Sequence, residues 1–390
     1  MLSFKFATQR RLCRFLPLMH VNQTAWRSVR TQSCVNGFGK RTRLDIPAQT
    51  SARIAGRKWL PGSTFPGNKL PEYLASPREN KPAVYEVIEE NVKLEEWSSR
   101  CREIIDEKLH VYGTILFRGL PVENADEFSR FFKKLGYSNM TYYGGAGERT
   151  EKADQVSSAS DVDPPLYTIE PHNEMAYADH YPLKIFFYCD VPAKPGLGGE
   201  SGITDVRDTV RKLDPKVVQK FDKLGLKYFF YSVSKDTTKD AFMSWQLRFR
   251  TEDKAEVEQY MKNHNCEYQW LENDGLSYWR YLPAFINHPI TGERVWFNQA
   301  STMNATYFYN HPVWAGKDLP ENRYPFTTYY GDGSVIEPEV LLHIRDVLWQ
   351  ETVGFQLQKG DVLAFDNIYA QHSRLGYDCE RILLVAMTSD

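Results

Sequence analysis

The stretch KGDVLAFDNIYAQHSRLGYDCERILLVAM, residues 359–387, decides the fold class. It holds two short apolar runs, 362–365 and 382–387, of which the first directly follows a turn-like Lys-Gly-Asp. Apolar runs of this length between turn signals are typical of buried strands, because they are too short for helices that cross a core. The end of the chain is therefore predicted to be β-structure.

The same pattern extends back to about residue 140, with further apolar runs at 185–189, 227–231 and 295–297. With 23 Tyr, 22 Phe and 9 Trp, the composition also suits pleated sheets. An earlier strand is expected at 114–117. Apolar spacing and cap residues predict helices between the strands, at 93–109, 125–135, 208–224, 252–263 and 337–351.

Helices that come early or are inserted, without a regular strand–helix alternation, argue against a doubly wound sheet. The sequence predicts a mainly β fold with inserted helices around a double-stranded β-helix, a jelly roll of the cupin-like kind. Residues 49–390 are expected to form one domain. Residues 45–80 are interpreted as an irregular segment in which Trp59 and Leu60 anchor the chain.

The first 44 residues carry nine Lys and Arg and no Asp or Glu. An Arg-rich, acid-free start with Ser, Thr and Leu is typical of a mitochondrial presequence, and a disordered basic tail is the alternative. We interpret residues 1–48 as presequence and disordered lead-in, which places the protein in mitochondria or otherwise in the cytoplasm. No run of 18 apolar residues occurs, so no membrane span is expected.

The remainder of the chain has 39 basic against 50 acidic residues, a net charge of −11. Such an acidic body does not indicate a nucleic-acid partner. The six cysteines are scattered without a C-x-x-C pair, which fits free thiols in a reducing compartment.

The segment Pro171-His172-Asn173-Glu174-Met175 offers the first candidate chemistry. If it is an extended strand, His172 and Glu174 point to the same face and can reach one metal ion together. Two imidazoles and one carboxylate on one face of an octahedron leave positions open, as non-haem Fe(II) oxygenases require. The H-x-E spacing alone is weak, because an exposed strand pair would look the same.

A second histidine must come from elsewhere, and His372 follows the run at 362–365. Arg381 lies at the head of the last apolar run, where a guanidinium could hold a carboxylate in bidentate geometry. The alternatives are a satisfied loop histidine and an ion pair at a strand edge.

Taken together, these segments resemble the TauD/TfdA-like 2-oxoglutarate dioxygenases, and within them the clavaminate synthase-like branch. The resemblance runs in order from about residue 112 to 390. It is carried by Gly113–Gly119, by His172–Ala176 with Phe186–Cys189 and Gly198–Ser201, by His288–Glu293 with Trp296–Asn298, and by Tyr330–Ser334, Glu351–Thr352, Gly360–Leu363, Asp366–Asn367, His372–Arg374 and Arg381–Leu383.

The resemblance implies that His172, Glu174 and His372 bind the iron. It implies that Arg381 grips the C5 carboxylate of 2-oxoglutarate. Ser201 stands where the family usually has Thr in a G-G-E-T segment, and its hydroxyl would help to hold the same carboxylate.

Asn298 lies in the W-F-N segment and would line the substrate pocket, with a turn-facing amide as the alternative. Glu174 in place of the more common Asp hints at an amino-acid-like or guanidino substrate. Val385 stands where taurine-type enzymes carry a further Arg, which disfavours a sulfonate. By position, loops 142–168 and 232–250 are expected to line the pocket, where Tyr residues could contact substrate or merely pack.

The resemblance therefore implies an oxidoreductase that uses Fe(II), 2-oxoglutarate and O2 to oxidise, by default to hydroxylate, a small metabolite, releasing succinate and CO2. A cupin-type metalloenzyme that ignores 2-oxoglutarate and a non-catalytic ligand-binding relative remain open. Asp205, Arg207 and Asp208, close to Ser201, are interpreted as ordinary surface charge.

Overall fold

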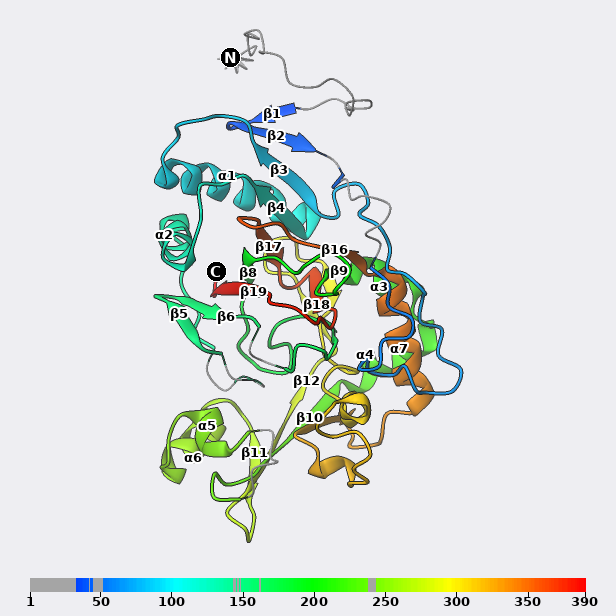
Figure 1. Ribbon diagram of the computed structural model, residues 1–390. Helices are drawn as coiled ribbons and strands as arrows, with labels where there is room; N and C mark the ends of the chain where they lie inside the picture. Colours follow the sequence, from blue (N-terminus) through cyan, green and yellow to red (C-terminus); the bar gives the residue numbers. More distant parts are fainter. Residues whose placement is uncertain are drawn as a thin grey trace, which may run out of the picture. The chain divides into compact units, whose positions relative to one another are not determined.

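The computed structural model describes residues 33–41, 43–44, 52–142, 145, 147, 149–160, 163–237 and 243–390. These residues fold as a mainly β structure with inserted helices, as predicted (Figure 1). The strands are β1 (Ser33–Val35), β2 (Phe38–Arg41), β3 (Ala83–Val87), β4 (Thr114–Arg118), β5 (Glu151–Ala153), β6 (Val156–Ser158), β7 (Ile169–His172), β8 (Lys184–Val191), β9 (Ser201–Asp205), β10 (Leu226–Ser232), β11 (Glu267–Trp270), β12 (Leu276–Leu282), β13 (Phe285–Asn287), β14 (Arg294–Trp296), β15 (Phe326–Tyr330), β16 (Val353–Phe355), β17 (Val362–Asp366), β18 (Ala370–Arg374) and β19 (Ile382–Thr388).

Helices lie between these strands along the chain, and some are short. They are α1 (Leu94–Tyr112), α2 (Ala125–Leu135), α3 (Val206–Lys212), α4 (Pro215–Leu224), α5 (Trp245–Phe249), α6 (Lys254–Asn263), α7 (Pro338–Glu351) and the 3-10 helices η2 (Ala305–Asn310) and η3 (Glu321–Arg323). The helix expected over 208–224 is divided in two, because Asp214 caps α4 and Pro215 begins it.

The largest sheet has nine strands in the order β1-β2-β3-β4-β17-β8-β19-β6-β5. Its centre is apolar on both faces, since successive side chains of a strand point to opposite sides. In β8, Phe186 and Tyr188 pack with the helices, whereas Ile185, Phe187 and Cys189 belong to the core on the other face. The runs that identified these strands are continuous because both faces are buried.

Helices α1 and α2 cover the first of these faces, with Trp97 and Phe128 buried against the sheet. The α2 boundaries follow from local chemistry. The side chain of Asn124 accepts a hydrogen bond from the N–H of Glu127 at 3.0 Å, and Gly136 ends the helix in the left-handed conformation.

A four-stranded sheet, β16-β9-β18-β7, lies over the second face. Ile203 and Phe355 from this sheet pack against Phe187 and Leu363 from the large one. Two sheets packed face to face with interdigitating side chains form a sandwich core, and the candidate site develops at its edge.

A third sheet, β11-β12-β10-β15, carries α5 and α6 alongside it (Figure 1). Its core is aromatic: Phe230 stacks on Tyr278 with ring centroids 4.7 Å apart, and Trp245 and Phe249 of α5 are buried. The loop predicted over 232–250 therefore contains a helix.

Strands β1 and β2 extend the large sheet through β3, so the described strands include residues within the segment 1–48 that was interpreted as presequence and lead-in. The presequence and lead-in prediction covers residues 1–48, of which 1–32, 42 and 45–48 lie outside the described residues. Leu60 is buried, and Trp59 packs against a core cluster, as predicted for this segment.

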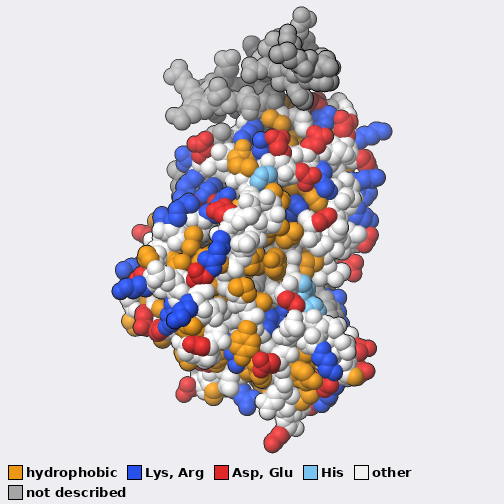
Figure 2. Space-filling model, turned by 180° about the vertical axis from the view of Figure 1, so that it is seen from behind, with side chains coloured by type: hydrophobic (Ala, Val, Ile, Leu, Met, Phe, Trp, Pro, Cys, Tyr) orange, Lys and Arg blue, Asp and Glu red, His pale blue; other side chains and the backbone are white. Residues whose placement is uncertain are grey.

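No helix among the described residues is both long and apolar enough to span a membrane. On the face shown in Figure 2, basic and acidic side chains are interspersed.

Candidate metal centre and adjoining cavity

His172 and His372 lie opposite each other on neighbouring strands of the small sheet. They are register partners in the antiparallel pair β7–β18, and their ring centroids are 4.2 Å apart. His372 thus lies within a strand and not in a loop. Phe187 and Phe365 of the large sheet flank its ring, at centroid distances of 5.0 and 5.7 Å.

Glu174 joins these histidines by a route that the sequence did not predict. Strand β7 ends at His172, and Glu174 belongs to the turn that follows, where Met175 has a φ of 57°. The turn, and not strand alternation, brings the Glu174 Oε2 atom to 3.6 Å from the His372 Nε2 atom. One candidate ligand atom from each of the three residues lies within 4.8 Å of the others.

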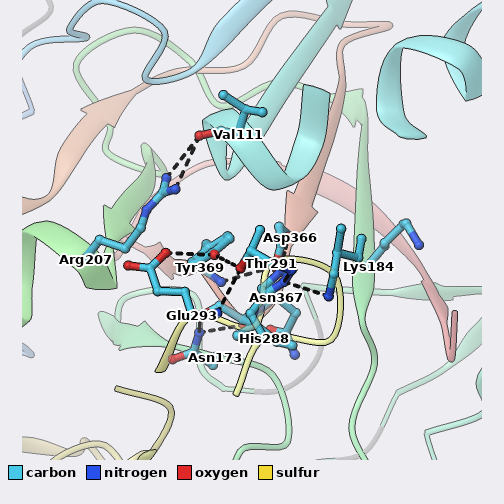
Figure 3. Close-up of polar contacts among 12 residues, drawn as sticks. Val111, Asn173, Lys184, Arg207, His288, Thr291, Glu293, Asp366, Asn367 and Tyr369 are labelled. Atoms are coloured by element: carbon cyan, nitrogen blue, oxygen red, sulfur yellow. Dashed lines mark hydrogen bonds and ion pairs between the residues drawn. The ribbon is translucent and has the colours of Figure 1, made fainter. Parts of the chain in front are cut away.

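Two asparagines hold this turn in place (Figure 3). The Oδ1 atom of Asn367 accepts the Glu174 N–H at 2.7 Å, and its Nδ2 donates to the Glu174 carbonyl at 2.9 Å. The Asn173 Nδ2 donates to the Asn367 carbonyl at 2.6 Å. The side chains of Asn173, Glu174 and Asn367 are buried. These hydrogen bonds therefore satisfy polar groups of the turn that would otherwise need water.

A polar network supports the start of the Asn367 segment (Figure 3). The His288 Nε2 lies 2.9 Å from an Asp366 carboxylate oxygen, while the Nδ1 atom of His288 accepts the N–H of Ile290 at 3.2 Å. The imidazole also stacks on the Tyr369 ring at 4.2 Å. This arrangement assigns the His288 proton to Nε2 and fixes the loop that carries Asn367.

The protonation of the three-residue cluster suits a metal. The His172 Nδ1 is 2.8 Å from the Glu170 carbonyl, so Nδ1 carries the proton and Nε2 is the free donor. Burial and the neighbouring His372 lower the pKa of His172 to about 3. Burial alone would raise the pKa of the Glu174 carboxyl, but Arg149 and His372 hold it below its usual range. A neutral imidazole and a carboxylate result.

Arg381 and Ser201 come together as predicted. The Arg381 Nη2 is 3.4 Å from the Ser201 Oγ, and its Nε donates to the Gly199 carbonyl at 3.0 Å. Gly199 has a φ of +77°, and a Cβ there would lie 3.0 Å from the Arg381 Cδ, so the segment needs glycine. Burial and the nearby Arg374 lower the pKa of Arg381 to about 10, which leaves it charged at neutral pH.

One cavity is lined by both groups, the three-residue cluster at one place and the Arg381–Ser201 pair at another. Apolar side chains that line the same cavity include Leu357, Leu363 and Leu383. Such walls exclude water and strengthen the charged contacts inside.

Asn298 does not line this cavity, which corrects its predicted role. Its Nδ2 donates to the Ala284 carbonyl at 3.1 Å and its Oδ1 accepts the Ala300 N–H, so it is the turn-facing amide. The adjacent Gln299 lines the cavity instead, and its side chain bonds to the Asn173 carbonyl.

The tyrosines of the predicted pocket loop have different roles. Tyr142 lines the cavity, whereas Tyr167 is fully buried and its hydroxyl bonds to the Tyr307 carbonyl. Tyr143 lies outside the described residues.

Asp205 is not surface charge. It is 7% exposed, caps α3 through the Arg207 N–H at 2.9 Å, and pairs with the guanidinium of Arg207 and with Lys81. It lies at the end of β9, the strand that Ser201 begins, and so secures the far end of that strand.

Arg149 was missed because nothing in its loop signals a site. Its Nη2 contacts the Glu174 Oε2, and its guanidinium lies 4.4 Å from the centre of the Tyr142 ring. Only the tertiary structure reveals this proximity.

A second cluster, Asp179, His180 and His264, has similar ligand types. Here the Asp179 Oδ1 is already bonded to the Nδ1 atoms of both histidines and to the Arg280 Nη1, at 2.8 to 3.0 Å. Its charge is balanced by a guanidinium, so this is an ion-pair network.

The chain resembles known proteins over most of its length. Residues 79–387 match the model of the taurine catabolism dioxygenase TauD, TfdA family. A clavaminate synthase-like protein of Arabidopsis thaliana is 30% identical over 291 residues, covering 73% of this chain and 84% of that protein. The dapdiamide synthesis protein DdaC of Enterobacter agglomerans is 32% identical over 285 residues, with the same two coverages.

Among solved structures, the PvcB protein of Pseudomonas aeruginosa aligns with 78% of this chain and 85% of its own chain. Its sequence identity is 13% and its TM-score is 0.44.

Proposed function

Because this chain belongs to the TauD, TfdA family, we propose that it is an Fe(II)- and 2-oxoglutarate-dependent dioxygenase that hydroxylates a small metabolite. Members of this family use Fe(II), 2-oxoglutarate and O2. The proposal rests on one observation above all. A two-histidine, one-carboxylate cluster and a buried arginine–hydroxyl pair line the same cavity.

The three-residue cluster fits an iron ion. His172 Nε2, His372 Nε2 and a Glu174 oxygen would supply two imidazole nitrogens and one carboxylate oxygen, the donor set that non-haem Fe(II) prefers. The backbone bond from His172 to Glu170 is the kind of outer contact that orients a metal-bound imidazole. The paired sheets that carry these residues support the interpretation as a double-stranded β-helix.

The Arg381–Ser201 pair fits the far carboxylate of 2-oxoglutarate. A guanidinium presents two parallel N–H groups to a carboxylate, and the serine hydroxyl can donate a further bond. Burial makes this charge-assisted contact stronger than it would be in water. Ser201 pairs with Arg374, two residues beyond His372 on β18, so the Arg381–Ser201 pair would hold the far end of an extended dicarboxylate.

Bound iron, 2-oxoglutarate and O2 together supply the oxidising power, with release of succinate and CO2. The chain positions the candidate ligands and shields the site from water. The Asn367 clamp holds Glu174, the β7–β18 register holds the two imidazoles, and the Phe187 and Phe365 rings pack against His372.

The experiment is succinate release by anaerobically purified protein supplied with Fe(II), ascorbate, 2-oxoglutarate and O2. Wild type should release succinate, and His172→Ala should not. His180→Ala, in the ion-pair network outside the cavity, is the matched control and should behave as wild type. Binding of 2-oxoglutarate is measured in the same samples, because turnover can require the substrate.

Iron binding without 2-oxoglutarate binding would favour a cupin-type metalloenzyme. Absence of both would favour a ligand-binding relative without catalysis, and would refute the proposal.

A further inference from the structure

A second cavity adjoins the metal cavity. Three residues, Tyr142, Gly147 and Arg149, line both, so they form the wall between the two spaces. The second cavity also reaches Arg248. Two buried guanidinium groups therefore face a space next to the metal cluster.

Within the part of the chain that the structure describes, Arg149 hydrogen-bonds to a protein group through only one of its nitrogens. Its side chain is 6% exposed, and its Nη2 contacts Glu174. Its Nε and Nη1 atoms are buried without a hydrogen-bond partner among the described residues. Such a group is costly to leave unpaired, since a buried charge needs partners for its donors.

Arg248, on another element, is also buried with part of its guanidinium unpaired among the described residues. It lies in α5 and is 3% exposed, with its Nε donating to the Ser232 Oγ at 3.2 Å and its Nη1 to the Gly145 carbonyl at 3.3 Å. Its Nη2 is buried without a partner among the described residues. The groups that accept these hydrogen bonds are neutral, so none of them balances the positive charge of Arg248.

Among the described residues, the acidic groups near these arginines are already engaged or exposed. Glu174 is a proposed iron ligand, so a bound metal ion would balance its negative charge. Asp163 accepts hydrogen bonds from Tyr307 and His311. In the second cavity, Glu151 and Asp154 are exposed at the rim, and Asp154 pairs with Lys133 at 2.9 Å.

We propose that Arg149 and Arg248 form an anion subsite that binds a carboxylate of the substrate. This inference rests on the proposed function and narrows its substrate class. The substrate would be a carboxylic acid whose charged end lies at these arginines, while an uncharged C–H-bearing part reaches toward the metal. A guanidino group at the same place is disfavoured, because two like charges already face it.

A phosphate ester offers similar anionic oxygens, so the test must separate the two. Calorimetric titrations are made anaerobically on protein saturated with Fe(II) and 2-oxoglutarate, so that the Arg381 position is filled. The probes are matched pairs: hexanoate and hexanamide, and N-acetyl-leucine and its amide. Hexyl phosphate is the third arm.

We expect at least one acid to bind about tenfold or more tightly than its amide, as the loss of a charge-assisted hydrogen bond predicts. Arg149→Met and Arg248→Met should each remove that preference. Arg250→Gln, at an exposed arginine lining the same cavity, should change affinity less than about twofold, because exposed charges are screened.

Equal binding of acid and amide in every pair, or wild-type preference in both methionine variants, overturns the inference. Tighter binding of hexyl phosphate than of either acid overturns the carboxylate assignment. Before these titrations, 2-oxoglutarate itself is titrated into the Fe(II)-loaded wild type, and failure to bind it refutes the proposed function itself. If Arg149→Met does not melt cooperatively, Arg248→Met, which does not touch Glu174, decides the outcome.

Discussion

His172 and His372 are direct partners across two antiparallel strands, with their rings 4.2 Å apart. The pairing register therefore determines whether a metal site exists. A slip by one residue would turn one imidazole to the other face of the small sheet. Packing of Phe187 and Phe365 against His372 resists such a slip, because these rings belong to the large sheet.

The first prediction concerns the metal itself. His372→Ala should weaken Fe(II) binding by about 100-fold or more, since even outer partners of metal ligands are worth 10- to 100-fold. Anaerobic Fe(II) titration measures the affinity. His343→Ala is the control and should retain wild-type affinity for Fe(II). The His343 Nε2 accepts a hydrogen bond from the backbone N–H of Asp214, the residue that caps α4. Unchanged binding by His372→Ala would remove this residue from the site.

The second prediction concerns the co-substrate. Arg381→Met should raise the KM for 2-oxoglutarate by roughly 10- to 100-fold, because a charge-assisted hydrogen bond is worth about 1.5–3 kcal/mol. Ser201→Ala should have a smaller effect in the same direction. Ser201→Thr retains the hydroxyl and should stay close to wild type. Steady-state kinetics over 2-oxoglutarate concentration measure each value, and equal KM values for Arg381→Met and wild type would contradict the assignment.

The third prediction concerns the turn that holds Glu174. Asn367→Ala removes bonds to the Glu174 N–H and carbonyl and to the Pro182 carbonyl. The variant should lose about 2–4 kcal/mol of unfolding free energy, as each buried group left unpaired costs about 1–3 kcal/mol. Fe(II) affinity should fall with it.

Urea denaturation measures the stability of Asn367→Ala. Asn322→Ala, at an exposed position, is the control and should lie within about 0.5 kcal/mol of wild type. A stable Asn367→Ala variant with full Fe(II) affinity would show that the clamp is dispensable.

The fourth prediction concerns pH. Burial would raise the pKa of Asp205, but Arg207 and Lys81 outweigh it and hold the pKa below 3.8. The native state thus keeps the carboxylate charged where the unfolded chain binds a proton. The stabilisation is fully present above the unfolded pKa and is lost as the pH falls through the folded pKa.

Asp205→Asn keeps the helix cap but removes the charge. It should lower the unfolding free energy by about 2 kcal/mol at neutral pH, and the difference from wild type should shrink as the solution is acidified. Denaturation curves across this range measure it, with the exposed Asp378→Asn as control. A difference that stays constant with pH would mean that the charge is not what stabilises.

Prediction from sequence succeeded where a signal is local. The runs at 185–189, 362–365 and 382–387 lie in β8, β17 and β19, because strands buried on both faces read as continuous apolar segments. At β7 it was correct only in part, because the strand exists but ends at His172 and does not reach Glu174. The assumption that His172 and Glu174 share one strand was consequently wrong, although both residues reach the site.

The amino-acid sequence was enough to identify the residue types of the site and their order, since His172, Glu174, His372 and Arg381 stand in segments that match a family. Which of the many buried polar groups lie together became visible in the folded chain alone. Asn298 faces its own turn, and Arg149 and Arg248 converge on one space. The physical reason is that strand register and turn geometry are set by packing between distant segments, whereas composition and spacing report only on neighbours along the chain.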